Sequence, residues 1–300
     1  MRRYRIYQVD AFTTEKFQGN PAGVVPAADG LSRAEMQAIA RELNNSETAF
    51  ILSPEAPDHE VRVRFFTPTV EVPSCGHATI AAHYVRAVEN GLASCTVVQK
   101  IGAGILPVEV IRDDSGYRIV MTQGTIEFSE PFSGVQVEEI TGALGLAASS
   151  LDERCPVQIV STGHSKVLVG IRSKETLDSL RPNLAGLAEI SGRIGCNGYY
   201  VFTLDSDTAD ILAHGRMFAP AIGIPEDPVT GNANGPLGAY LVKHGLAAPV
   251  DGRLSFRARQ GEAIGRPGTV EVSVETEGST PKVVSVAGRA VIVFRSELEL

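Results

Sequence analysis

The sequence predicts an α+β protein made of two similar domains. Strand-like segments, in which apolar and polar residues alternate, outnumber the helical segments and occur in both halves of the chain. The second half repeats the order of segments of the first half at an offset of about 151 residues, as from Ile39 to Ile190. With 300 residues, 43% of them hydrophobic, the chain is long enough for two domains that each bury a core.

In the first half, we expect one helix over residues 31–45 and a second over residues 76–90. Apolar residues recur at helical spacing in the first of these, and Ser32 with Glu35 forms the pattern of a capping box. The second helix is expected to end at Gly91, because glycine accepts the left-handed conformation that stops a helix. Strands are expected at residues 4–12, 24–25, 47–52, 61–67, 95–99, 106–111 and 117–122.

The second half contains matching segments. The stretches RFFTPTVEVPSCGHATIAAHYVRAVENG and RMFAPAIGIPEDPVTGNANGPLGAYLVKHG share an Arg, a Phe, two Pro, a Gly that opens a helix and a Gly that ends it. Likewise, IARELNNSETAFIL aligns with ISGRIGCNGYYVFTL. Two copies indicate two domains that face each other across a cleft, rather than a solenoid. The elements expected here are strands at 157–161, 167–170 and 199–204, a helix at 184–194, and a helix that opens at Gly231.

The starts of the two repeated helices are candidate binding groups. Gly76 and His77 open one helix, and Gly231 and Asn232 open the other. The first turn of a helix offers unpaired backbone N–H groups and a partial positive charge. If the two starts meet at one point, they can bind a carboxylate and stabilise an enolate.

Composition and motifs exclude several classes of protein. The net charge of −8 and the lack of a long basic run argue against a nucleic-acid partner. Four cysteines without C-x-x-C spacing indicate free thiols in a reducing compartment, and no stretch is long and apolar enough to predict a membrane span, so we expect a cytoplasmic protein. Phosphate-binding loops and the serine-hydrolase elbow are absent from the sequence.

Three residues near the first repeated loop could carry chemistry. Glu47 opens the strand ETAFIL, while Gly198 stands at the matching position of the second half. Glu47 is therefore either a solvated strand-end charge or an acid/base that only the first half supplies. Cys75 aligns with Thr230, whose hydroxyl is not acidic enough for a two-thiol proton exchange, so we expect Cys75 to be a small buried residue. His77 is either a site residue or a structural group at the helix start.

The second repeated loop, PEDPVTGNANGP, adds polar groups. Asp227 is either a turn or N-cap residue, or a ligand for a substrate hydroxyl or amine. Thr230, Gly231 and Asn232 follow it at the helix start, and Gly231 lets a ligand approach the backbone closely. Asn20 opens a similar turn, NPAG, in the first half. The spacing of the histidines does not suit a metal site, so no metal is expected.

Taken together and in this order, the motifs VDAFTTEKFQGNPAGVV, NNSETAF, TPTVEVPSCGHAT, GCNGYY and EDPVTGNANGPLGAY resemble the PhzF-like isomerases of phenazine biosynthesis, which share the fold of diaminopimelate epimerase. The resemblance covers essentially the whole chain. It implies two pseudo-symmetric domains, each a curled β-sheet around a central helix, with residues 1–121 and a last strand at about 286–300 in the first domain and residues 122–285 in the second. It also implies a cofactor-independent enzyme and a homodimer.

Transferred residue by residue, the resemblance makes Glu47 the acid/base, His77 and Asp227 its catalytic partners, and Gly76 part of the binding loop. One position departs from the pattern, because the phenazine-pathway members carry a serine where this chain has Asn232. Asparagine can still bind a carboxylate, but its larger amide changes the pocket. This difference argues against the phenazine precursor, a dihydro-hydroxyanthranilate, as the substrate.

The expected function is therefore a cofactor-independent isomerase in which Glu47 moves a proton on a small carboxylate-bearing substrate, in the cleft between the domains. One base suffices to relocate a proton, whereas inversion needs two, so the pairing of Glu47 with Gly198 favours relocation. Two alternatives remain open: an amino-acid epimerase that uses Cys75, and a non-catalytic protein that only binds a small acid. The expected substrate-binding residues are Asn20, Gly76, Thr230, Gly231 and Asn232.

Overall fold

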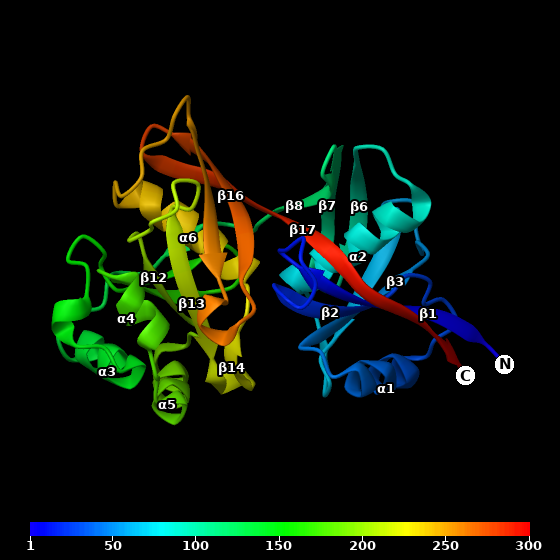
Figure 1. The fold of residues 1–300 in the computed structure, drawn as a ribbon, viewed down its shortest axis with the longest axis horizontal. Helices are drawn as coiled ribbons and strands as arrows, with labels where there is room; N and C mark the ends of the chain where they lie inside the picture. The colour runs from blue at the N-terminus through cyan, green and yellow to red at the C-terminus, as the bar shows by residue number, and fades with distance from the viewer. The chain divides into compact units, whose positions relative to one another are not determined.

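The computed structural model describes residues 1–300, which form two compact units (Figure 1). The first unit contains Met1–Thr122 and Ala287–Leu300, and the second contains Gln123–Val286. The first unit is thus assembled from both ends of the sequence. The backbone N–H of Arg2 donates to the carbonyl of Leu300 at 2.7 Å, and the two ends of the chain lie side by side.

The first unit is a mixed sheet with two helices, α1 (Arg33–Leu43) and α2 (Gly76–Asn90). Hydrogen-bonded neighbours give the strand order β17, β1, β2, β3, β4, β6, β7, β8, with the short β5 also paired to β4. Only β2–β3 and β4–β6 are parallel. The strands are β1 (Arg3–Ala11), β2 (Asn20–Val25), β3 (Glu47–Leu52), β4 (Val61–Phe66), β5 (Glu71–Val72), β6 (Cys95–Ile101), β7 (Gly104–Asp113), β8 (Gly116–Thr122) and β17 (Thr280–Glu299).

Helix α2 is the centre of the first unit. It packs against β1, β2 and β3 and also against β7 and β8, so strands from both ends of the order contact the same helix and the sheet must curl around it. Nine of its residues are buried, and most of these are alanine, valine or isoleucine, which allow close packing on several sides. Gly91 ends the helix in the left-handed conformation, with φ of 59°.

Helix α1 shows the capping box that the sequence predicts. The Ser32 hydroxyl accepts from the Glu35 N–H at 3.2 Å, and the Glu35 carboxylate accepts from the Ser32 N–H at 2.7 Å. Met36, Ile39 and Ala40 face the core. The helix ends at Asn44, which adopts the left-handed conformation directly before β3 begins at Glu47.

The second unit has the same plan, with α6 (Gly231–Lys243) as its central helix. Its strand order is β9, β10, β11, β12, β13, β15, β16, with β14 also paired to β13. The strands are β9 (Glu127–Phe128), β10 (Gln158–Ser161), β11 (Lys166–Ile171), β12 (Tyr199–Thr203), β13 (Ala213–Ala219), β14 (Ile224–Asp227), β15 (Arg253–Gln260) and β16 (Gly268–Glu277). The other helices are α3 (Val135–Leu144), α4 (Lys174–Ser179), α5 (Leu184–Ile194) and the short η1 (Ala148–Ser150), η2 (Pro220–Ile222) and η3 (Glu262–Ile264).

The repeat read from the sequence is also present in the strand pairings. From β1 to β7, the consecutive pairings are antiparallel, parallel, antiparallel, antiparallel, parallel and antiparallel. From β10 to β16, the series is the same. Helix α6 contacts β10 and β11 as well as β15 and β16, so this sheet also curls around its helix. The fold class, α+β with a curled sheet around a central helix in each unit, is therefore as predicted.

Helix α6 can approach its sheet closely because it carries small residues. A Cβ on Gly238 would lie 2.8 Å from methyl groups of Val272 and Val274, and a Cβ on Gly235 would overlap the side chain of Gln123. These glycines therefore face strands and a side chain, not solvent. The same close packing fixes where the first turn of α6, at Gly231, lies within the unit.

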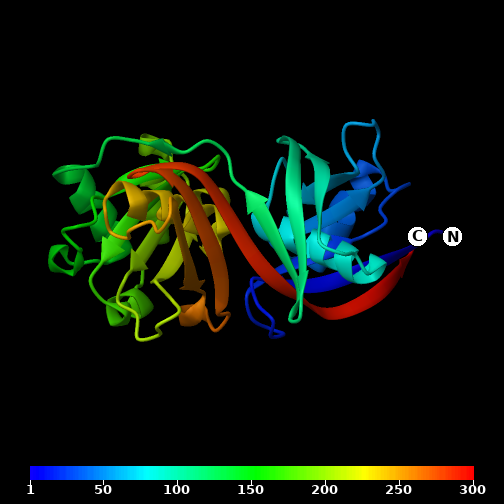
Figure 2. The same ribbon diagram turned by 90° about the horizontal axis from the view of Figure 1, so that it is seen from above.

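Strand β17 belongs to both units. Its residues up to Val286 lie in the second unit and those from Ala287 lie in the first, where Ala290 to Glu299 pair antiparallel with β1. Figure 2 shows this last strand in red beside the blue N-terminal strand. None of the helices combines the length and apolar content needed to cross a lipid bilayer.

Most of the predicted elements are confirmed, and α5 has the predicted bounds. Helices α3 and α4 were not predicted as elements. Helix α4 has six residues, which is too short for a helical period to show. The N-cap of α3 is Gly134, which has no side chain to form a cap, so the usual signal of a helix start is missing.

Candidate functional site

In the first unit, the candidate residues gather at the N-terminus of α2. Cys75 occupies the N-cap position in an extended conformation and makes no side-chain cap, and Gly76 is the first helical residue. Glu47 reaches the same place as the first residue of β3, which packs against α2. The Glu47 side chain is 14% exposed and the His77 side chain is 8% exposed, so both are largely buried.

His77 links the polar groups of this cluster through both ring nitrogens. Its Nε2 lies 3.4 Å from the Glu47 carboxylate and 3.2 Å from the Ser46 hydroxyl. Its Nδ1 lies 3.5 Å from the Cys75 thiol. The imidazole thus contacts both a carboxylate and a thiol, an arrangement that can orient the carboxylate and pass a proton to or from it.

The same three residues, Glu47, Cys75 and His77, have ligand atoms within 4.8 Å of one another, which raises the question of a metal. The Glu47 carboxylate contacts Nε2 and the Cys75 thiol contacts Nδ1 of the same ring. One imidazole offers a metal one nitrogen, so an ion held by these three groups would replace one of the two contacts of His77. In the structure the three groups form a hydrogen-bonded cluster.

Asn20 is the first residue of β2 and is fully buried. Strand β2 runs parallel to β3, with Ala22 opposite Glu47, so Asn20 lies two residues before the ladder partner of Glu47. The register therefore places Asn20 and Glu47 at the same end of two neighbouring strands. The cluster at the N-terminus of α2 lies at this same end of the two strands.

In the second unit, Asp227 and Thr230 form a connected turn before α6. The Thr230 hydroxyl donates to the Asp227 carboxylate. Gln260 supports both residues, since its Nε2 donates to the Asp227 carbonyl at 2.7 Å and its Oε1 accepts from the Thr230 N–H at 3.1 Å. Gln260 is 1% exposed, and it also accepts from Asn234 at 3.2 Å. The buried amide of Gln260 therefore fixes the conformation of the turn.

The first residues of α6 are not regular helix. Thr230 is the N-cap and makes no side-chain cap, and Asn232 has φ of −79° and ψ of 15°, outside the helical region. The carbonyl of Gly231 accepts from the Gln123 amide at 3.1 Å. Gly231 is buried and Asn232 is half-buried, so the asparagine side chain is the more accessible of the two.

Sequence reasoning missed three of the groups that shape these sites. Ser46 lies inside the NNSETAF motif, and its contact with His77 depends on the fold. Gln260 comes from β15, far along the chain from the turn that it supports. Lys166 opens β11 and is 8% exposed. The only signal for Lys166 in the sequence was a lysine at the start of an apolar run.

The expectation that Cys75 is buried is wrong, because as N-cap it is half-exposed at the helix start.

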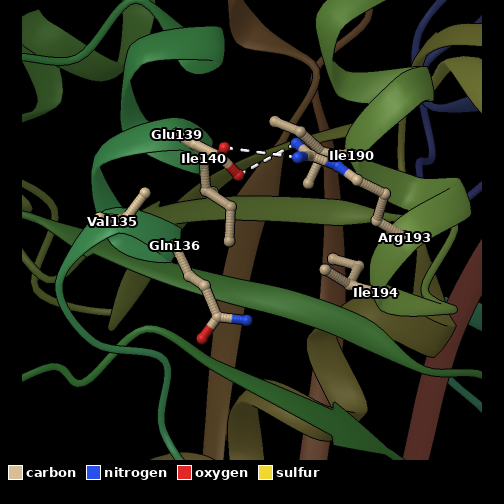
Figure 3. A pocket seen from close by; sticks show the side chains of 7 residues that line it. All are labelled: Val135, Gln136, Glu139, Ile140, Ile190, Arg193 and Ile194. Carbon is tan, nitrogen blue, oxygen red and sulfur yellow. Dashed lines mark hydrogen bonds and ion pairs between the residues drawn. The ribbon is translucent and has the colours of Figure 1, made fainter.

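A separate groove of about 300 Å³ lies on the second unit between α3 and α5 (Figure 3). The Glu139–Arg193 ion pair spans it at 3.0 Å, and its other lining groups are largely aliphatic. Its charged groups neutralise each other, and none of the candidate residues lines it. The groove therefore contributes nothing to the chemistry of the clusters at α2 and α6.

Comparison with known proteins identifies the family. The model of the phenazine biosynthesis-like proteins matches residues 9–296. This chain belongs to the PhzF-like isomerase family. An uncharacterized isomerase of Clostridium acetobutylicum is 59% identical over 300 residues, which cover 100% of this chain and 99% of the relative. The trans-2,3-dihydro-3-hydroxyanthranilate isomerase of Pseudomonas aeruginosa is 32% identical over 289 residues, which cover 96% of each chain.

Solved structures of PhzF-like proteins share the fold. A phenazine biosynthesis protein of the PhzF family from Bacillus anthracis has a TM-score of 0.90 at 33% identity, with 100% of both chains covered. A hydroxyproline epimerase from Agrobacterium vitis has a TM-score of 0.66 at 14% identity, covering 100% of this chain and 93% of the epimerase. The second likeness shows the fold alone, which is the epimerase-like fold expected for PhzF-like isomerases.

Proposed function

We propose that this PhzF-like isomerase relocates a proton on a small carboxylate-bearing substrate, with Glu47 as the general acid/base. The observation that carries the proposal is the buried pair of Glu47 and His77, 3.4 Å apart at the start of α2. A carboxylate in this position is held for proton transfer, since a neighbouring imidazole and hydroxyl fix its orientation. Because such a transfer needs a positioned base, neither a metal nor an organic cofactor is required.

The repeat supports relocation over inversion. Glu47 opens β3, and the residue directly before β12, its counterpart in the matching series of pairings, is Gly198. Gly198 has no side chain that can act as a second carboxylate base. A single base can remove a proton from one carbon and return it to another on the same face, whereas inversion of one carbon needs a second acid/base on the opposite face.

The other groups are assigned binding roles. His77 and Asp227 orient the polar groups of the substrate, and the backbone N–H groups at Gly76 and Gly231 bind its carboxylate and the negative charge that develops during the transfer. Asn20, Thr230 and Asn232 complete the set of hydrogen-bonding side chains. Asn232 is half-buried and irregular in conformation, so its amide can turn toward a ligand. The proposed enzyme acts as a homodimer.

Solvent exchange tests the proposal directly. Small carboxylic acids with an allylic or α C–H, among them trans-2,3-dihydro-3-hydroxyanthranilate, are incubated with the protein in D₂O and followed by ¹H NMR. Wild-type protein is expected to introduce deuterium into at least one of them. Glu47→Gln should slow this exchange by about 100- to 10,000-fold, the usual contribution of a general acid/base, and Cys75→Ala should leave it within about tenfold.

Cys75→Ala is the matched control because the Cys75 thiol contacts the same imidazole, at 3.5 Å. This contact is also the observation that favours the rival function, an amino-acid epimerase with Cys75 as a base. Loss of exchange in Cys75→Ala together with full exchange in Glu47→Gln would establish that rival and refute our assignment. If the acids bind equally to all three proteins and none exchanges, the chain only binds small acids.

A further inference from the structure

In the second unit, Lys166 is the counterpart of Ala22, and its side chain lies over Gly198, the counterpart of Glu47. In the first unit, β2 pairs in parallel with β3, and Ala22 lies opposite Glu47. In the second unit, β11 pairs in parallel with β12, and Val167 lies opposite Tyr199. One residue earlier, Lys166 and Gly198 therefore stand where Ala22 and Glu47 stand, with the longer side chain now on the other strand of the pair.

The lysine side chain fills the space that Gly198 leaves open. A Cβ built on Gly198 would lie 2.5 Å from Cδ of Lys166 and 2.4 Å from Cε of Met217. No side chain can stand at position 198 unless this lysine moves. The second unit therefore has no glutamate at the position of Gly198, and the amine-bearing side chain of Lys166, which has the opposite charge, fills the space there.

The amine of Lys166 is within electrostatic reach of Asp227, in the turn before α6. Met217, which lies over the same glycine, is the ladder partner of Asp227 on β14. Asp227 and Cys196 act electrostatically on Lys166, and His164 is affected by the charge of Lys166. The amine donates to the carbonyl of Ser165 at 3.1 Å, which uses one of the three hydrogens of an ammonium group.

Burial makes this ammonium a strong ligand for an anion. Lys166 is 8% exposed, and burial, the largest cause, lowers its pKa from 10.5 to about 8, while Cys196 and Asp227 act in the opposite direction. The group is still mostly charged at pH 7. A charged donor in a site with little water binds a carboxylate more strongly than the same donor on the surface.

We propose that Lys166 binds the carboxylate of the substrate from the second unit, as a cation that complements the N–H groups at the start of α6. This inference deepens the function proposed above and rests on it for the chemical class of the ligand. It predicts a preference for acids over the corresponding amides, because an amide has no charge to pair with the ammonium. Lys166 then contributes to the affinity for the substrate, and Glu47 transfers the proton.

The first experiment compares Lys166→Met, Lys166→Arg and the control Lys282→Met, whose side chain is 51% exposed and pairs with Glu277. For the acid that exchanges in D₂O, Lys166→Met should raise KM by about 10- to 100-fold, the loss expected for a hydrogen bond to a charged group. It should change kcat much less, Lys166→Arg should recover part of the affinity, and Lys282→Met should match wild type. An unchanged KM in Lys166→Met would overturn the inference.

The second experiment needs no turnover. The chain has six lysines, so reductive ¹³C-methylation gives few NMR signals, and the Lys166 signal is assigned by its loss in Lys166→Met. This signal should titrate near pH 8, and its pKa should rise when a small carboxylate is added but not when the matching amide is added. A shift in a protein that exchanges no proton would support Lys166 while refuting Glu47. Normal exchange without any shift would refute Lys166 alone.

Discussion

Burial of His83 in the first unit favours the uncharged imidazole in the folded protein. His83 lies on the central helix α2, is 1% exposed, and its Nε2 is 3.0 Å from Oε1 of Gln99. Burial, the largest cause, lowers the pKa of His83 from 6.5 to about 4, against a smaller opposing effect of the Gln99 hydrogen bond. A proton on this ring would place a charge in the interior of the sheet that surrounds α2.

The size of the effect follows from this shift. Between pH 6.5 and about 4, the unfolded chain binds a proton at His83 that the folded chain does not bind. The stabilisation is therefore fully present above pH 6.5 and is lost as the pH falls toward 4. The complete shift corresponds to roughly 3 kcal/mol of the free energy of unfolding, of which about 2 kcal/mol is lost between pH 7.5 and pH 5.

Urea unfolding at pH 7.5 and pH 5 measures this loss in wild type and in His83→Gln. Far-UV circular dichroism is the suitable signal because the chain has no tryptophan. The carboxylates titrate alike in both proteins, so the difference between the two pH dependences isolates His83. Wild type should lose about 2 kcal/mol more than His83→Gln. Equal losses in the two proteins would refute the reasoning.

Two further predictions concern stability. Ser32→Ala removes the capping box of α1 and should lower the free energy of unfolding by about 1 kcal/mol, measured by urea unfolding; an unchanged midpoint would contradict it. Glu226→Ala should cost about 3 to 5 kcal/mol, because it leaves the buried Arg216 guanidinium, now bound at 2.8 and 2.9 Å, without its carboxylate. Glu275→Ala, which breaks an exposed pair with Arg253, is the control and should cost less than about 1 kcal/mol.

The elements with strong local signals were predictable from the sequence. Helix α1 has a capping box and an apolar face, and β3 and β4 have bounds set by apolar runs. Helix α3 lacks such a signal, since its cap is a glycine and only three of its residues are buried. Local patterns thus predict an element where its own residues carry the cap or the periodicity, and fail where distant packing holds it.

The candidate site was predictable only in part, for a different reason. The contact between Glu47 and His77 joins two elements that are far apart in the sequence, so spacing did not predict it, and the two residues were assigned to one site only through the family motifs. Lys166 was not predicted as a site residue because lysine is ordinarily a surface residue, and a lysine at the start of an apolar strand is interpreted as a flanking charge. Its burial follows from the missing side chain of Gly198, which no local pattern reports.

The route of β17 has a consequence for biosynthesis. Residues 287–300 complete the first unit, yet the ribosome makes them only after the whole of residues 123–286. Until then β1 has β2 on one side and an open edge on the other, a state in which a nascent chain can pair with other polypeptides. The N-terminal half therefore cannot finish folding before the rest of the chain has been made, contrary to the usual vectorial order.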